Sequence, residues 1–482
     1  MRHRRRVVAG LVAVAMAALV AVIASGGEHR DSASPTGSTL AATFRDRDGD
    51  GVLERGPGEQ LRDRTDLAPR ARPGRTIAVL AQISDAHVRD EESPARAFLL
   101  DRTGAPFTSS FRPQEALSGQ VLAASVASIN AIRPQAVLVT GDLLDSAQEN
   151  ELDQAIEALE GGVVEPDSGD PGYDGPQSAF NADPFLYRPD SDAPRHPGLL
   201  ARAQSPFRSA GLTAPWFPVL GNHDLLVSGE APPSPALERL ALGGREPAEL
   251  DPGVELPREP QDLEALLEQG FPGPTVPTPA DPARRHLGVQ ELLDRLRRAS
   301  GSGGEGERLD YSFDVGPRLR VIALDLVRRD GRSQGKVTSD QVAWLSDELE
   351  RAGSRWVIVT SHQPLTRSQG GEAALAALDR SPTVIAVLSG HTHRSSIEPR
   401  RSAAGGYWLI ATPSLADYPQ QARALRLRET AGGGAAIETW MLDTAPASLP
   451  DVARDLAFLD AQGGRPKGAA GRVEDRNARL FR

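Results

Sequence analysis

The sequence predicts an α/β fold in which layered sheets are flanked by helices. Short apolar runs rich in Val and Ile recur along the chain, and segments with helical spacing separate several of them. Apolar runs of about 4–8 residues are typical of buried strands, and their alternation with helices favours an α/β arrangement. The expected strands are Ile77–Ile83, Ala136–Thr140, Trp216–Leu220, Leu319–Leu324, Trp356–Thr360, Val384–Leu388 and Tyr407–Ile410.

Helices are expected between these runs, most clearly at Glu115–Ile132 and Ser339–Arg351. The second segment places Trp344, Leu345 and Leu349 on one face, and Ser339 is its expected N-cap. Shorter helices are expected at Gln261–Gln269, Val289–Ala299 and Asp451–Asp460.

The composition is that of a globular protein without thiol chemistry. The 482 residues are 39% hydrophobic and 25% charged, enough for a large core. The absence of cysteine excludes disulfides, thiolate metal ligands and cysteine nucleophiles, so any metal must use nitrogen and oxygen ligands. The net charge of −11 disfavours nucleic acid or anionic lipid as a general partner.

The N-terminus has the pattern of an export signal. An Arg-rich start is followed by the apolar run Val7–Ala24, and the small residues Val22 and Ala24 precede Ser25. This order is typical of a cleaved signal peptide over residues 1–24. The run is also long enough for an uncleaved membrane anchor. We therefore expect an exported protein, extracellular or at the cell surface, that contacts membrane only through this segment if it is uncleaved.

The rest of the chain divides into three predicted regions. Residues 25–75 are polar and rich in Gly, Pro and Arg, and we expect an extended N-terminal arm. Residues 76–445 form the expected main domain, with two long insertions at 146–215 and 225–310 that are rich in Pro, Gly and Asp. Residues 446–482 are expected to form a C-terminal helix and tail.

A possible calcium loop lies within the arm. Asp46, Asp48 and Asp50 precede Gly51 with the spacing of the first half of an EF-hand loop. The bidentate glutamate expected at the twelfth position is replaced by Pro57, although Glu54 or Glu59 lies nearby. The alternative is an acidic turn without an ion.

Five short polar motifs follow the predicted strands. Because carboxyl ends of neighbouring strands meet at one edge of an α/β sheet, these motifs are expected to share a site. Five of the nine histidines fall within them, which argues against chance. The motifs are Asp85-Ala86-His87, Gly141-Asp142, Gly221-Asn222-His223-Asp224, Ser361-His362 and Gly390-His391-Thr392-His393.

Imidazole and carboxylate are the ligands that Mn, Fe and Zn accept in proteins, so the motifs predict a site for such metals. A carboxylate has two oxygens and can bridge two ions. Bound metal lowers the pKa of water from about 16 toward 7, which supplies a nucleophile at neutral pH.

The order of these motifs resembles that of the calcineurin-like metallophosphoesterases, over roughly residues 76–415. The resemblance implies a sandwich of two mixed sheets flanked by helices, and two metal ions. It also implies roles for each motif residue. The first metal would be held by Asp85, His87 and His393, the second by Asn222, His362 and His391, with Asp142 bridging the two. His223 would stabilise the phosphoryl group or protonate the leaving oxygen, and Asp224 would orient His223.

The expected reaction is hydrolysis of a small-molecule or lipid phosphate ester, either a diester or a monoester, by a metal-bridging hydroxide. The motif form resembles the cyclic nucleotide phosphodiesterase-like branch most. The sequence Asp145-Ser146-Ala147 after the second motif, and Asp224 in the third, depart from the protein phosphatase pattern. Asp145 is expected to be structural, and Arg89, Arg112 and Arg394 are candidates for phosphate contact. The alternative is a non-catalytic exported surface protein that keeps its metals for stability.

Overall fold

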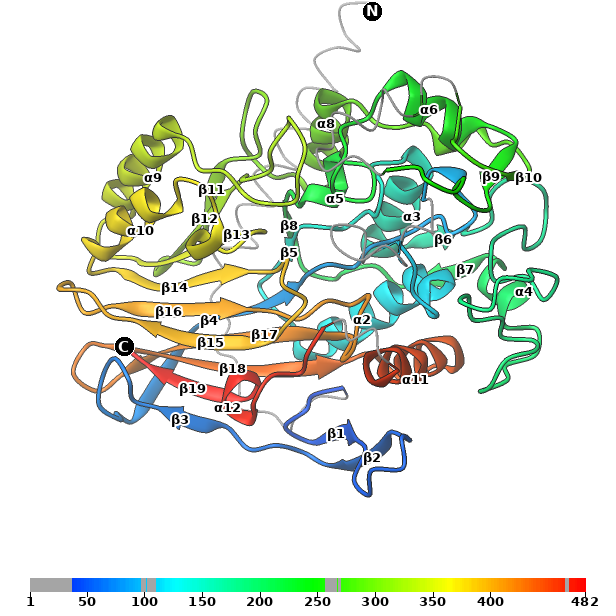
Figure 1. Ribbon diagram of the computed structural model, residues 1–482. Coiled ribbons are helices and arrows are strands. Elements are labelled where there is room, and N and C mark those ends of the chain that lie inside the picture. The colour runs from blue at the N-terminus through cyan, green and yellow to red at the C-terminus, as the bar shows by residue number, and fades with distance from the viewer. Residues whose placement is uncertain (1–36, 97–100, 102–109, 256–266, 268–269, 464–467) are drawn as a thin grey trace, which may run out of the picture.

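The computed structural model describes residues 37–96, 101, 110–255, 267, 270–463 and 468–482. It contains two large mixed β-sheets that pack face to face, with helices outside them (Figure 1). The predicted α/β fold is confirmed, and each of the seven expected strands is present with its ends shifted by no more than a few residues.

The first sheet has six strands, four of them parallel and an antiparallel strand at each edge. Its strands, in spatial order, are β11 (Tyr311–Val315), β12 (Leu319–Leu324), β13 (Trp356–Ser361), β14 (Val384–Ser389), β16 (Tyr407–Ala411) and β15 (Ser396–Arg400).

The second sheet has seven strands and a parallel half that carries three of the motifs. Its strands, in spatial order, are β3 (Arg62–Arg64), β19 (Ala478–Phe481), β18 (Ala435–Asp443), β17 (Gln421–Thr430), β4 (Pro73–Ile83), β5 (Ala136–Thr140) and β8 (Trp216–Val219). The parallel strands β4, β5 and β8 therefore end at the same edge.

Strand periodicity explains the layers. In β4, Ala78 and Leu80 lie in the core between the two sheets, whereas Val79, Ala81 and Ile83 lie in the core beneath the helices. Successive side chains of a strand point to opposite faces, so a strand buried on both faces must be apolar at every position. This is why the motif-bearing strands appear in the sequence as apolar runs with few polar residues, such as Gln82 in β4 and Thr360 in β13.

The helices cover the outer faces of both sheets. The seven-stranded sheet is covered by α2 (Ser118–Ile132), α3 (Glu149–Glu160), α8 (Val289–Ser300) and α11 (Ser448–Gln462). The six-stranded sheet is covered by α9 (Ser339–Ala352) and α10 (Gly371–Asp379). The predicted N-cap of α9 was wrong by one residue, because the hydroxyl of Thr338 accepts the hydrogen bond from Gln341 N at 3.2 Å.

The arm and the tail are bound to the sheet more closely than predicted. A hairpin of β1 (Ala42–Arg45) and β2 (Glu54–Pro57) precedes β3, which pairs with the tail strand β19. Asn477 connects these parts, because its Oδ1 accepts from Thr39 Oγ1 at 3.0 Å and from Met441 N at 3.1 Å, and its Nδ2 donates to Glu59 O at 3.0 Å. The two ends of the described chain thus belong to one sheet.

The predicted insertions contain more helices and strands than the sequence indicated. The first includes α3, which buries Leu152, Ala155 and Leu159 in the main core. It also includes β6 (Gly162–Val164), α4 (Leu199–Ala203) and β7 (Phe207–Ser209). The second includes α6 (Pro235–Leu242), β9 (Arg245–Pro247) and β10 (Thr275–Pro277), and α8 confirms the helix expected at Val289–Ala299. The expected helix Gln261–Gln269 lies outside the described residues except for Leu267, and so does the predicted signal segment 1–24.

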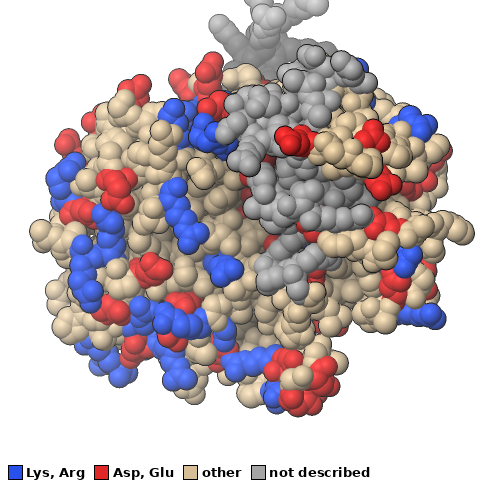
Figure 2. All heavy atoms as spheres, in the orientation of Figure 1, with Lys and Arg blue, Asp and Glu red and all other residues tan. Residues whose placement is uncertain are grey.

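The surface is mixed in charge. Figure 2 shows basic and acidic side chains interspersed over the face turned to the viewer, without a continuous basic stripe among the described residues. In the part of the chain that the structure describes, no helix is both long and apolar enough to cross a membrane. The absence of a nucleic-acid partner stays a prediction.

We predict that Asn477→Ala lowers the free energy of unfolding by about 3 kcal/mol, because the deletion removes the side-chain partner of the buried groups Met441 N and Glu59 O and one of the two acceptors of Thr39 Oγ1. Urea denaturation followed by circular dichroism measures the change. The control is Asn181→Ala, whose two hydrogen bonds lie in a part-buried loop where water can replace them. Equal effects of the two substitutions would contradict the role given to Asn477.

Candidate metal centre

The motif side chains converge where strands of both sheets end. Asp85 follows β4, Asp142 follows β5, the short helix α5 (Asn222–Leu225) follows β8, His362 follows β13, and His391 follows β14. Donor atoms of Asp85, His87, Asp142 and His393 lie within 4.8 Å of one another, and so do those of Asp142, His362 and His391. Asp142 is common to both groups, as expected of a bridging carboxylate.

Three histidines present Nε2 to the centre because Nδ1 of each has another partner. His87 Nδ1 lies 3.0 Å from Asp145 Oδ1, His362 Nδ1 lies 2.9 Å from Thr140 O, and His393 Nδ1 lies 2.5 Å from Asp417 Oδ2. A donor hydrogen bond from Nδ1 fixes the tautomer and leaves the Nε2 lone pair for a metal.

The donor set fits two cations. His87 Nε2 and His393 Nε2 are only 3.3 Å apart, and Asp85 Oδ1 lies 3.2 Å from His393 Nε2. His362 Nε2 is buried and makes no hydrogen bond, although Asp142 Oδ2 is 3.0 Å away. Imidazole nitrogens and carboxylate oxygens whose lone pairs face one another without a hydrogen bond require positive charge between them. Nitrogen and oxygen donors of this kind suit Mn, Fe or Zn.

Neighbouring charged groups shift the pKa values of the carboxylates and histidines in the site. Burial raises the pKa of Asp142, but the adjacent His362 and His223 outweigh it and hold that pKa well below its usual value. Burial lowers the pKa of His393, yet Asp85 and Asp417 raise it to about 10. Without metal, histidinium therefore supplies the positive charge that the carboxylates need.

The backbone at the ligands is unusual. Asp85, His87, Asp142, His391 and His393 all have positive φ, between 44° and 64°. Such a conformation costs a non-glycine residue about 1–3 kcal/mol and occurs where the surroundings enforce it. Backbone hydrogen bonds do so here, from Asp85 N to Gly141 O at 3.0 Å and from His87 N to Asp142 O at 2.9 Å.

Glycine at position 141 is required by the same packing. Its φ is +83°, and a Cβ there would lie 2.5 Å from Nδ1 of His362. A larger residue would displace that histidine from Thr140 O.

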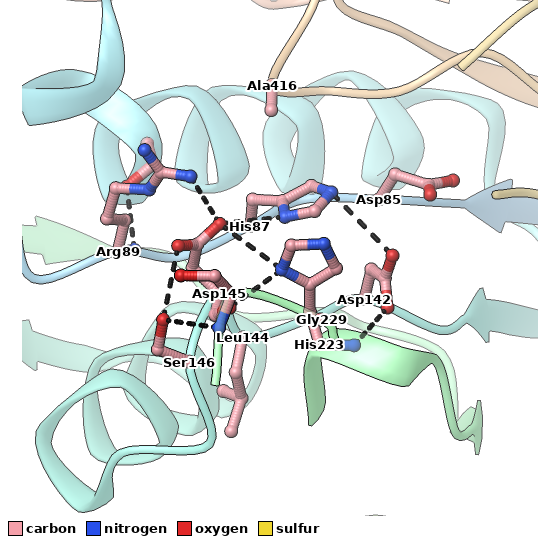
Figure 3. A network of polar contacts seen from close by, with 12 residues as sticks. Asp85, His87, Arg89, Asp142, Leu144, Asp145, Ser146, His223, Gly229 and Ala416 are labelled. Atoms are coloured by element: carbon pink, nitrogen blue, oxygen red, sulfur yellow. Dashed lines mark hydrogen bonds and ion pairs between the residues drawn. The ribbon is translucent and has the colours of Figure 1, made fainter. Parts of the chain in front are cut away.

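His223 is held by Asp145 (Figure 3). Its Nδ1 lies 2.7 Å from the backbone oxygen of Asp145 and 3.6 Å from Oδ1 of the same residue, and its backbone N donates to Asp142 Oδ1 at 2.8 Å. Its ring lies edge-on to His87, with the centroids 4.4 Å apart. This geometry leaves Nε2 of His223 as the atom that can meet a substrate.

The orienting role predicted for Asp224 was wrong. Both oxygens of Asp224 accept hydrogen bonds from the backbone, Oδ1 from Leu144 N at 2.9 Å and Oδ2 from Gly221 N at 2.7 Å. Asp224 therefore fixes the loop that carries Asp142 against the start of α5. Burial, together with the Asp142 charge, raises the pKa of Asp224 to about 7.

Two arginines proposed for phosphate contact are used within the protein. Arg89 is buried, lies 2.5 Å from Asp145 Oδ1 and also pairs with Glu115. Arg112 is buried and donates to both oxygens of Asp417 at 2.6 and 3.2 Å. Neither is placed for substrate, whereas Arg394 is exposed and remains a candidate.

Asn222 was predicted as a ligand of the second metal, and this role stays a prediction. Its Nδ2 donates to Gly229 O at 3.0 Å, which directs the carbonyl oxygen Oδ1 away from that contact. Gln363 Nε2 approaches Oδ1 at 3.3 Å. Gly229 has φ +74°, and a Cβ there would lie 2.3 Å from Nε2 of His223, so glycine keeps this side of His223 free.

Asp417 is the functional residue that sequence analysis missed. It lies after β16, outside every motif, and it joins His393 to Arg112. Burial raises the pKa of Asp417, but Arg112 and His393 outweigh it and hold that pKa well below its usual value. No local sequence signal indicates such a residue, because its partners lie 24 and 305 positions away.

The candidate calcium loop is a separate acidic group. Carboxylate oxygens of Asp46, Asp48 and Asp50 lie within 4.8 Å of one another. The carboxylate of Asp46 already accepts from Gly49 N at 2.8 Å and Gly51 N at 3.1 Å, as in an acidic turn. Calcium binding here stays a prediction.

Residues 79–395 match the calcineurin-like phosphoesterase family. The chain belongs to this family. Its members are phosphoric ester hydrolases with a dinuclear metal centre, which agrees with the grouping of ligands around Asp142. The predicted family is thereby confirmed.

Individual relatives are more distant. The glycerophosphodiester phosphodiesterase GpdQ of Enterobacter lignolyticus (strain SCF1) is 29% identical over 112 residues, which cover 21% of this chain and 39% of that protein. A dimetal phosphatase from Danio rerio aligns over 77% of this chain and 100% of its own, with 13% identity and a TM-score of 0.40. A purple acid phosphatase from yellow lupin (Lupinus luteus) aligns over 78% and 54%, with 11% identity and a TM-score of 0.31.

We predict that Asp417→Asn weakens metal binding about 10- to 100-fold, because it removes the carboxylate that orients His393. Metal content after dialysis against graded chelator measures the change. Asp379→Asn is the matched control, since Asp379 is also an arginine-paired aspartate, bound to Arg400 at 2.7 Å, but belongs to α10. Unchanged metal affinity in a folded Asp417→Asn protein would refute the positioning role.

Proposed function

We propose that this protein hydrolyses phosphate esters, with phosphodiesters preferred, at a centre that holds two ions of Mn, Fe or Zn. The observation that carries the proposal is the pair of ligand groups that share Asp142, with His223 beside them. The family supports ester hydrolysis, and the relative named a glycerophosphodiester phosphodiesterase supports a diester. The N-terminal pattern supports action outside the cell.

In this proposal, Asp85, His87 and His393 would hold one ion, Asn222, His362 and His391 would hold the other, and Asp142 would serve both. When bound, the two ions lower the pKa of water to about 7 and offset the charge of the phosphoryl oxygens. His391 and His393 are half-buried whereas the carboxylates are buried, so an ester would approach from the histidine side.

The protein's own residues contribute orientation and a proton. Asp145 is held by Arg89 and His87, and its backbone oxygen lies within hydrogen-bond distance of Nδ1 of His223. This contact fixes the ring so that Nε2 lies on the side away from Asp145. A protonated His223 Nε2 would donate its proton to the oxygen of the departing alcohol. General-acid assistance of this kind contributes about 10²- to 10⁴-fold.

We predict metal-dependent turnover of bis-p-nitrophenyl phosphate, faster than that of p-nitrophenyl phosphate, after the metal-stripped protein is reloaded with Mn²⁺. Asp142→Asn should reduce this turnover by at least about 100-fold, because it removes the carboxylate shared by both ligand groups. The loss should exceed that caused by removing a residue that only hydrogen-bonds to a ligand. Asp153→Asn, at an exposed site on α3, serves as the control. A metal-loaded protein inactive on both esters would argue for a non-catalytic role.

We also predict that His223→Asn lowers kcat more for glycerophosphoethanolamine, whose leaving group is an alkoxide, than for bis-p-nitrophenyl phosphate. Nitrophenolate leaves without a proton, so only the alkoxide needs the acid. Steady-state kinetics on both substrates measure the difference. An equal loss on both would instead assign His223 to stabilisation of the phosphoryl group.

A further inference from the structure

A cavity of about 420 Å³ lies between β1, the start of β17 and α11, apart from the metal centre. These elements come from opposite ends of the chain and meet on one side of the molecule (Figure 1). Small-molecule sites commonly have volumes of about 300–1,000 Å³. The described residues that line this cavity include none of the predicted ligands of the two-metal centre, although Asp46 of the candidate calcium loop is among them.

Arg454 is the unusual residue of this cavity. It is only 6% exposed, and its Nη2 pairs with Asp451 Oδ1 at 3.0 Å. Its other nitrogens, Nε and Nη1, are buried without a hydrogen-bond partner, and Nε lies 3.9 Å from Asp455 Oδ1. A buried donor of a cation that lacks an acceptor is unfavourable unless a ligand supplies one.

The other charged groups of the cavity already have partners. Arg45 and Arg476 both pair with Glu59. The carboxylate of Asp46 accepts from Gly49 N at 2.8 Å and from Gly51 N at 3.1 Å. Asp443 accepts from Gln421 Nε2 at 2.6 Å, which leaves the buried Gln421 Oε1 without a partner. The free groups are therefore cationic donors from Arg454 and one neutral acceptor from Gln421.

Aromatic rings form the remaining wall. The guanidinium of Arg454 lies 3.6 Å from the centroid of the Phe44 ring. The rings of Tyr418 and Phe458 lie close to each other, with centroids 5.1 Å apart. Rings beside a cation with free donors form a surface for a ligand that is anionic at one end and apolar along its body.

We propose that this cavity binds a small organic anion. Its carboxylate or phosphate oxygens accept hydrogen bonds from Nε and Nη1 of Arg454, and its apolar body contacts Phe44, Tyr418 and Phe458. A hydroxyl or N–H of the ligand donates to Oε1 of Gln421. Tyr418 directly follows Asp417, so the site shares a loop with the metal centre but none of its ligands.

Calorimetric titration of the full, metal-loaded protein with benzoate, phenylphosphonate and neutral benzamide tests the proposal. We expect at least one of the two anions to bind with a Kd of about 1 mM or tighter, and benzamide to bind at least about tenfold more weakly. The anion that binds more tightly distinguishes a carboxylate ligand from a phosphate ligand.

Arg454→Met should weaken anion binding about tenfold or more, because it removes the charged donors and keeps an unbranched side chain. Arg351→Met is the matched control. Arg351 also pairs with an acid three residues earlier, Glu348 at 2.6 Å, but it is exposed on α9.

A second variant tests the proposal if Arg454→Met does not fold. Gln462→Trp alters a residue that lines the cavity yet is exposed at the end of α11, so the larger side chain narrows the cavity without entering the core. It should also weaken binding. Failure of both anions to bind the folded wild-type protein, or unchanged affinity in Arg454→Met and Gln462→Trp, would overturn the proposal. Equal binding of benzamide would do the same.

Discussion

Two buried carboxylates, Asp85 and Asp142, set the constraint on which the rest of the site depends. A carboxylate removed from water must be compensated by positive charge or by hydrogen bonds, or else it takes up a proton. Here histidines from both sheets surround the pair, and Asp417 and Asp145 in turn orient two of those histidines. The histidines thus compensate the charge of the buried carboxylates, and Asp417 and Asp145 orient the histidines that do so.

The same constraint shapes the backbone. Carboxylates and imidazoles from separate strand ends must point at one place, and a strand that simply continued would direct alternate residues to opposite faces. Residues with positive φ, in the left-handed region, follow β4, β5 and β14. This backbone conformation ends the alternation of side-chain direction. Their conformational free energy is offset by hydrogen bonds between the loops, such as the bond from His87 N to Asp142 O.

Much of this arrangement was predictable from sequence because its signals are local. The motif-bearing strands are apolar at successive positions, and the motif residues follow them directly. The role of Asp224, the partners of Arg89 and Arg112, and the importance of Asp417 were not predictable, because each depends on contacts between segments far apart in the chain. The tail strand β19 was missed for a related reason, since Ala478–Phe481 is short and includes a charged residue. Such a strand is specified by its neighbours β18 and β3 rather than by its own pattern.

The place of β19 has a consequence for how the protein is made. Because β19 lies between β18 and β3, the seven-stranded sheet stays incomplete until residues 478–481 have been synthesised. A chain that stopped earlier would leave the backbone groups of β18 unpaired along an open edge, a surface prone to aggregation. The last strand of the described chain thus protects the edge of β18 from pairing with another chain.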